Sequence, residues 1–203
     1  MRSPHIRLFS TGLAALVAFS CTRQPDTVPA DSSLEGAHNA FWNSLTALCG
    51  KAYSGRATES VPPDTVMSRQ QLVMHVRDCS ADTIRIPFHV GENRSRTWVL
   101  TRTANGLRLK HDHRHEDGAP DSVTMYGGDT QVAGTAASQE FHADSATAAM
   151  IPAARTNVWT IQVEPGRVFA YALRREGSDR RFRAEFDLAT AVPTPPAAWG
   201  ASR

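Results

Sequence analysis

The sequence predicts a mainly β protein, a single closed antiparallel up-and-down β-barrel of about ten strands with a short N-terminal helix. Apolar and polar residues alternate with a period of two through most of residues 51–188, and short glycine-containing turns separate the alternating segments. A sheet of this many antiparallel strands would expose two edges unless it closed on itself. We therefore expect a closed sheet.

The domain is expected to open with a helix over residues 38–48. Its apolar residues recur at helical spacing, and Gly50 follows as a stop signal. These apolar residues are Phe41, Trp42, Leu45 and Leu48. A second short helix is expected at residues 145–150, where Asp144 is a candidate N-cap and Pro152 ends the segment.

Ten segments are expected to form strands. They are residues 51–59, 70–76, 84–90, 98–103, 107–115, 122–126, 138–142, 157–163, 167–174 and 180–188. The dipeptides at the expected turns are Asn105-Gly106, Asp117-Gly118, Gly127-Gly128, Pro165-Gly166 and Gly177-Ser178. Such dipeptides are typical of hairpins, so we expect an antiparallel meander.

One helix followed by about ten strands, over residues 40–190, resembles the calycin superfamily of lipocalin and fatty-acid-binding-like barrels. The resemblance implies an interior that holds a small molecule. The chain departs from the Gly-x-Trp start of lipocalins, because residues 48–55 read Leu-Cys-Gly-Lys-Ala-Tyr-Ser-Gly. Fold resemblance alone implies no activity.

The N-terminus indicates export. Arg2 and Arg7 precede an apolar stretch over residues 8–19, and the small residue Ser20 follows it. The apolar stretch is too short to span a bilayer. This is the order of a secretory signal, so we expect residues 1–20 to be removed as a signal peptide.

Cys21 directly follows the expected cleavage site, which resembles the lipobox of bacterial lipoproteins, where this thiol receives diacylglycerol. Ala18 and Phe19 depart from the preferred residues of that motif. We expect Cys21 to be lipidated, with plain secretion as the alternative. The lipid would hold the protein at the inner or outer membrane of a bacterial envelope, on the periplasmic side or at the surface.

Composition divides the remainder of the chain. Residues 21–36 contain few apolar residues and are expected to form a flexible tether. Residues 37–192 form the predicted barrel domain, and residues 193–203 a Pro-rich tail extended along its surface.

The chain has three cysteines, an odd number for an oxidising compartment. Lipidation of Cys21 would leave Cys49 and Cys79 to form a disulfide, which would stabilise the fold by roughly 3 kcal/mol. The alternative is two buried free thiols.

The charge excludes one class of partner. The chain has 22 basic and 20 acidic side chains, and removal of residues 1–20 takes away two arginines and no acid. The mature chain is therefore formally neutral, which gives no attraction for nucleic acid. We expect a monomer whose partners are a small molecule and, through its lipid, a membrane.

The candidate site lies on the hairpin around Asn105-Gly106. Strand periodicity places His111, His113 and His115 on the same face as two leucines, and Arg96 and Trp98 on the same face as Leu100. With a two-residue turn at Asn105-Gly106, Leu100 would pair with His111, Trp98 with His113 and Arg96 with His115.

A buried unsatisfied polar group costs about 1–3 kcal/mol, so this wall predicts a binding site for a polar or anionic group. The predicted ligand-binding residues are Arg96, Trp98, His111, His113 and His115. In the alternative, the strand passes the rim of the barrel and leaves His113 and His115 in water.

The spacing of His111 and His113 also resembles the paired metal ligands of cupins and carbonic anhydrases. A third ligand would be needed, and Glu140 and His142 are candidates, because His75 and His89 are expected to face outward. No cofactor is predicted beyond this metal hypothesis. The imidazoles could equally act as hydrogen-bonding groups or as a general base.

Two other segments predict no site. Residues 126–129 read as a turn, because they lack the lysine and following helix of a phosphate loop. The arginines at 174, 175, 180, 181 and 183 flank a hairpin and predict a solvated face, with contact to anionic lipid headgroups as the alternative.

Residues 91–98, 111–118 and 126–128 together resemble an uncharacterised family of exported bacterial lipoproteins, which implies no activity. The leading hypothesis is an envelope lipoprotein that binds a small polar or amphipathic ligand inside a β-barrel. The alternatives are an enzyme that uses the interior histidines as general base or metal ligands, and a non-catalytic envelope interaction protein.

Overall fold

A computed structural model describes residue 1 and residues 34–201 of the 203-residue chain. Apart from Met1, the expected signal peptide lies outside the described residues, as does the predicted lipidation site Cys21. The first helix begins at Leu34, inside the segment predicted as tether. Within the described residues, no helix is both long enough and apolar enough to cross a membrane.

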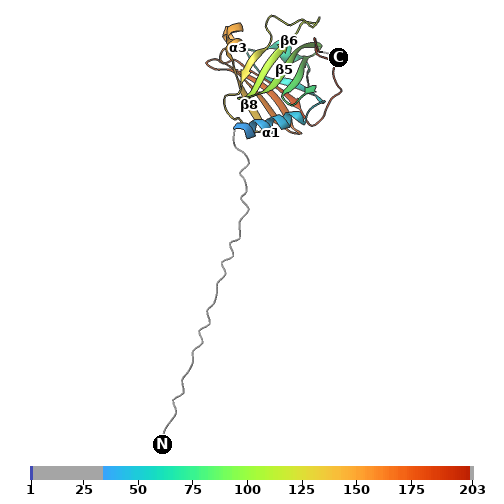
Figure 1. The fold of residues 1–203 in the computed structure, drawn as a ribbon. Helices are drawn as coiled ribbons and strands as arrows, with labels where there is room; N and C mark the ends of the chain where they lie inside the picture. Colours follow the sequence, from blue (N-terminus) through green and yellow to red (C-terminus); the bar gives the residue numbers. More distant parts are fainter. Residues whose placement is uncertain (2–33, 202–203) are drawn as a thin grey trace.

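The strands form one antiparallel sheet curled into a closed barrel (Figure 1). They are β1 (Ala52–Val61), β2 (Leu72–His75), β3 (Asp78–Cys79), β4 (Thr83–Val90), β5 (Asn93–Thr103), β6 (Gly106–His113), β7 (Tyr126–Asp129), β8 (Ser138–Ala143), β9 (Asn157–Glu164), β10 (Val168–Arg175) and β11 (Arg181–Asp187). The order is β2-β1-β11-β10-β9-β8-β7-β6-β5-β4-β3, and β2 also pairs with β4. This pairing closes a ten-stranded ring and leaves β3 as an extra strand, which confirms the predicted fold.

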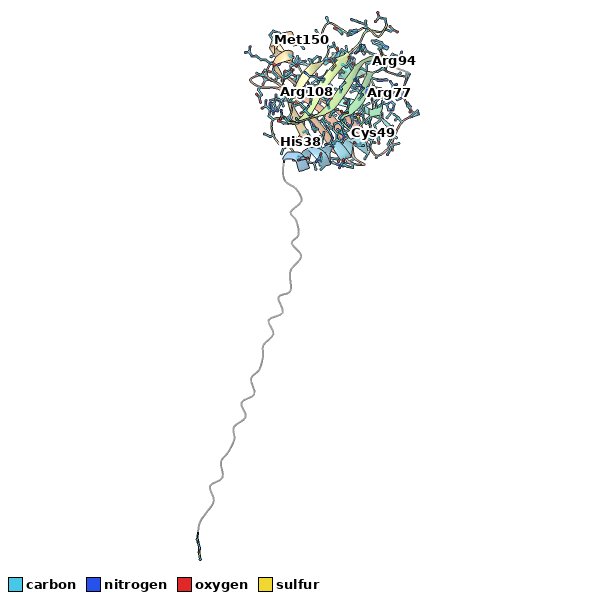
Figure 2. All side chains as sticks on the ribbon, viewed as in Figure 1. His38, Cys49, Arg77, Arg94, Arg108 and Met150 are labelled. Carbon is cyan, nitrogen blue, oxygen red and sulfur yellow. A yellow bond between two sulfur atoms is a disulfide. The ribbon has the colours of Figure 1, made fainter. Side chains whose placement is uncertain are left out.

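Helices lie at opposite ends of the barrel (Figure 1). They are α1 (Leu34–Thr46), α2 (Thr65–Arg69), α3 (Ser145–Met150) and the 3-10 helix η1 (Pro152–Ala154). Helix α1 packs against β6, β8 and β9 and buries Phe41 and Leu45 completely, so we call its end the plugged end. Figure 2 shows His38 of α1 at this end and Met150 of α3 at the other, which we call the open end.

Aromatic side chains fill much of the interior. Alternate residues of β4 face inward as predicted, with Phe88 only 2% exposed. The Phe88 and Trp98 rings stack with centroids 4.6 Å apart, and Trp98 also stacks on Phe169 at 5.8 Å. The interior is therefore a packed core over most of its length, and space for a ligand must be sought near the open end.

The strand predicted at residues 122–126 is placed wrongly, because β7 begins only at Tyr126. The Asp121 carboxylate accepts a hydrogen bond from the Val123 N–H at 2.9 Å, and Met125 has a φ of 57°. Both features belong to a turn and interrupt an extended backbone. Residues 121–125 consequently form part of the loop at the open end.

Gly127 and Gly128 lie inside β7, although the sequence pattern indicated a turn. A Cβ atom on Gly128 would lie 1.6 Å from the His142 carbonyl oxygen, and one on Gly127 would lie 2.0 Å from that of Leu109. The two glycines therefore allow the close approach of the neighbouring backbones at this point of the wall.

Cys49 and Cys79 are joined by a disulfide, as predicted. Cys49 follows α1 and Cys79 ends β3, so the bond ties the chain after the plugging helix to the extra strand of the sheet. The position of the bond places the second cysteine outside the barrel wall, where its side chain is exposed.

The C-terminal tail crosses the outside of the barrel. Val192 pairs with Ala52 of β1, and the Ala197 carbonyl accepts a hydrogen bond from the Arg94 guanidinium of β5 at 3.0 Å. In the closed sheet β2 and β4 lie between these two contacts, and residues 198–201 share a surface hollow with Pro87 of β4 and Thr97 of β5. The described end of the tail therefore lies against the outer faces of β4 and β5.

Two histidines at outward positions of the sheet are buried. His75 and His89 occupy outward positions of β2 and β4, as the alternation predicted, yet they are only 8% and 4% exposed. Burial, together with the smaller effects of the charges of Arg94 and His75, lowers the pKa of His89 to about 4. His89 is thus held neutral by its burial.

Candidate functional site

A pocket of about 440 Å³ opens at the open end of the barrel. Four of the five predicted site residues line it: Arg96, Trp98, His111 and His113. Its other walls come from β1 and α2 on one side and from β10 and β11 on another, with Tyr126 of β7 beside the histidines. The volume lies in the range of small-molecule sites, roughly 300–1,000 Å³.

The predicted pairing between β5 and β6 is wrong by two residues. Thr103 pairs with Gly106, so the turn is Ala104-Asn105, and Trp98 pairs with His111 and Arg96 with His113. A shift of two residues keeps every side chain on its predicted face, because side chains alternate with a period of two. Arg96, Trp98, His111 and His113 therefore remain on the inner wall, as predicted.

His115 is the residue that the wall loses. Strand β6 ends at His113, and His115 is exposed in the loop that follows. The prediction that His115 faces the interior is wrong, since the strand passes the rim before reaching it. The alternative interpretation placed both His113 and His115 in water. The structure shows His115 exposed, whereas His113 lines the pocket.

His111 is buried and has both ring nitrogens engaged. Its Nδ1–H donates to the Tyr126 carbonyl oxygen at 3.1 Å, and the Tyr171 hydroxyl donates to Nε2 at 2.8 Å. A carbonyl oxygen only accepts, so this contact fixes the proton on Nδ1. Burial lowers the pKa of His111 to about 3. His111 is therefore a neutral structural group in the pocket floor.

His113 is less buried and lies closer to the mouth. Its Nε2 lies 3.2 Å from the Tyr126 hydroxyl, whose ring stacks on His111 with centroids 4.6 Å apart. Burial lowers the pKa of His113, and the charge of Arg96 lowers it further. His113 is thus mainly neutral near pH 7 and can accept or donate a hydrogen bond to a ligand. It is also the remaining candidate for a general base.

An aromatic surface forms the inner side of the pocket. Trp98 stacks on Tyr171 with centroids 4.6 Å apart, and Phe182 lies at 6.2 Å from Tyr171. Met67 of α2 and Leu173 of β10 extend this surface toward the mouth. The pocket therefore offers apolar and aromatic contacts on one side and hydrogen-bonding groups on the other.

The described residues do not support a metal centre. No group of three or more His, Cys, Asp or Glu side chains gathers within the part of the chain that the structure describes. Both nitrogens of His111 are already hydrogen-bonded, and Glu140 and His142 lie on β8 positions that alternate with the buried Gln139 and Phe141. The proposed third ligands therefore point away from the histidine pair.

Several pocket residues were missed from the sequence. Tyr171 was not singled out within the strand predicted at residues 167–174, and Tyr126 was assigned to a turn. Arg180 and Arg181 were assigned to a solvated face, but both line the mouth of the pocket. Their place at the start of β11, on the same end of the barrel as His113, could have been read from the strand order alone.

Fold and site together define a single-domain closed β-barrel with a mixed aromatic and polar pocket at one end. Comparisons of the chain with protein-family models, with curated proteins and with solved structures found no significant match.

Proposed function

We propose that this protein is an envelope lipoprotein that binds a small amphipathic ligand in the pocket at the open end of its barrel. The observation that carries the proposal is the pocket itself, where the aromatic side chains of Trp98, Tyr171 and Phe182 form one wall beside the hydrogen-bonding groups of His113 and Arg96. A barrel stabilised only by its core would fill this space with aliphatic side chains. A ligand that buries an apolar body there gains roughly 25 cal/mol per Å² of apolar surface.

The neutral fluorophore N-phenyl-1-naphthylamine tests this binding. We expect fluorescence enhancement that saturates at one probe per chain in the wild-type protein. Leu173→Trp places a larger side chain in the pocket wall and should abolish that binding. Met150→Trp adds the same side chain to exposed α3, outside the pocket lining, and should leave binding unchanged. Equal binding by both variants would refute the proposal.

The lipoprotein part of the proposal rests on Cys21 and has its own test. Intact mass of the protein extracted from the membrane fraction should show the mass of acyl groups on a chain that begins at Cys21. The Cys21→Ser variant should instead be recovered in soluble form. Because α1 begins at Leu34 at the plugged end, a tether from Cys21 would join the barrel at the end opposite the pocket mouth.

A further inference from the structure

We propose that the ligand is an organic anion, with its charged head held between Arg96, Arg180 and Arg181 and its apolar body on the aromatic wall. This inference rests on the proposed function, because it assigns the chemical class of the ligand of the same pocket. The added claim is that the arginines at the mouth recognise the ligand and that they require a negative charge on it.

The three arginines line the same mouth from two parts of the barrel. Arg96 lies on β5 next to His113, whereas Arg180 and Arg181 lie at the turn between β10 and β11. Burial raises the pKa of Tyr126 to about 12, and the charges of Arg96 and Arg180 partly oppose that rise. Tyr126, Arg96 and Arg180 line the same pocket.

Two other arginines of the β10–β11 hairpin form ion pairs with carboxylates of the barrel wall. Arg174 forms an ion pair with Glu140 at 2.7 Å, and Arg183 forms one with Glu185 at 2.7 Å. Within the described residues, Arg96, Arg180 and Arg181 have no such carboxylate partner, and Arg96 donates only to the neutral oxygens of Asn93 and Ser95. The paired arginines stabilise the wall, while these three leave donors for a ligand.

The pocket does not neutralise these cations itself. The acidic residue in its lining is Asp64, whose carboxylate already accepts from the Val66 and Met67 N–H groups at the start of α2. His111 stays neutral, and its nitrogens face protein partners. Three positive groups against one engaged carboxylate give the mouth a net positive charge, which favours a carboxylate, sulfonate or phosphate over a neutral head.

Size and shape limit the remainder of the ligand. About 440 Å³ fits a body of one or two rings or a short chain, and the partly exposed ring of Phe182 suits contact with a planar group. The apolar body would enter first and the anionic head would remain at the rim, where Arg180 and Arg181 are exposed.

A matched pair of probes tests the charge requirement. N-phenyl-1-naphthylamine is neutral, and 8-anilinonaphthalene-1-sulfonate has the same ring body with one added anion. We expect the sulfonate to bind the wild-type protein about tenfold more tightly, the size of a charge-assisted hydrogen bond. Displacement by 1-naphthoate and by 1-naphthyl phosphate then distinguishes a carboxylate from a phosphate head.

Two double variants of equal charge locate the effect. Arg180→Gln with Arg181→Gln should remove the tenfold preference and leave the neutral probe within about twofold of wild type. Arg56→Gln with Arg85→Gln removes two exposed arginines outside the pocket lining and should preserve the preference. A third variant, Arg96→Gln, should also remove the preference for the sulfonate and leave binding of the neutral probe within about twofold of wild type.

The outcomes separate the two proposals. If the neutral probe binds in the pocket and the sulfonate binds no more tightly, the proposed binding function is supported and the inference of an anionic ligand is overturned. An equal loss of preference in both double variants would overturn it as well, because a general effect of net charge would then explain the result. If neither probe binds the wild-type protein, the proposed function itself fails.

Discussion

The Tyr171 hydroxyl lies 2.8 Å from His111 Nε2 and joins β10 to β6 across the interior of the barrel. Three strands separate β10 from β6 in the sheet order, so this bond links parts of the wall that the ladder does not connect directly. It also holds the imidazole that stacks on Tyr126, and Tyr126 in turn contacts His113. The floor of the pocket is therefore positioned by one buried hydrogen bond.

Tyr171→Phe should destabilise the fold by about 1–3 kcal/mol, because it leaves His111 Nε2 buried without a donor. Urea unfolding followed by fluorescence would measure the loss. The variant His111→Phe gives the matched control, since Tyr171→Phe should cost much less in that background. Equal costs in the two backgrounds would show that the two side chains do not interact energetically.

The neutral state of His111 predicts a loss of stability in acid. Its folded pKa of about 3 lies below the ordinary value near 6.5, so the unfolded chain binds the proton more readily. The stability contribution of neutral His111 is complete above pH 6.5 and is lost as the pH falls toward 3. Between pH 7 and pH 5 this one group should cost about 2 kcal/mol.

Urea unfolding at pH 7 and at pH 5 checks this dependence. In His111→Phe, the decrease in the free energy of unfolding between pH 7 and pH 5 should be smaller than in wild type by about 2 kcal/mol. Part of the decrease should remain, because His89 also has a lowered pKa. Exposed His115→Asn serves as the control and should keep the wild-type dependence. A His111→Phe protein with the full acid sensitivity of wild type would contradict the assignment.

The sequence predicted the barrel because its strongest signal, the period of two, depends only on which face of a strand is buried. The same signal placed Arg96, Trp98, His111 and His113 inside. It did not determine the register, since shifts of two residues preserve every face, and only the turn at Ala104-Asn105 decides between them.

Other features depend on contacts between distant segments and could not be read locally. Tyr126 looked like part of a turn because two glycines follow it, whereas those glycines serve the close approach of β6 and β8. Arg180 looked like a surface charge, and the role that we propose for it depends on its having no ion-pair partner among the described residues. Pairing between charges far apart in sequence leaves no periodic signal.

Gly128→Ala should destabilise the barrel strongly. The added Cβ would lie 1.6 Å from the His142 carbonyl oxygen, which belongs to the backbone of β8 and cannot rotate away. We expect a loss above about 3 kcal/mol or failure to fold. Gly177→Ala is the control, because no atom lies within 4 Å of its Cβ and only its φ of 73° opposes alanine, at roughly 1 kcal/mol. Thermal unfolding would compare the two, and similar melting temperatures would contradict the close approach at Gly128.

Arg94 donates a hydrogen bond to the Ala197 carbonyl of the tail, and residues 198–201 lie against the outer face of β4, the strand that contains His89. We therefore expect deletion of residues 193–203 to expose His89 and to raise its pKa from about 4 toward 6.5, because burial is the main cause of the lowered value. Titration of the histidine ring protons by NMR would measure the shift directly. Arg94→Gln removes the hydrogen bond to the Ala197 carbonyl but keeps the tail, so it should raise the pKa less than the deletion does. His111, inside the barrel, is the internal reference and should keep its low pKa in both proteins. An unchanged His89 pKa in the truncated chain would mean that the outer face of β4 is covered by something other than the tail.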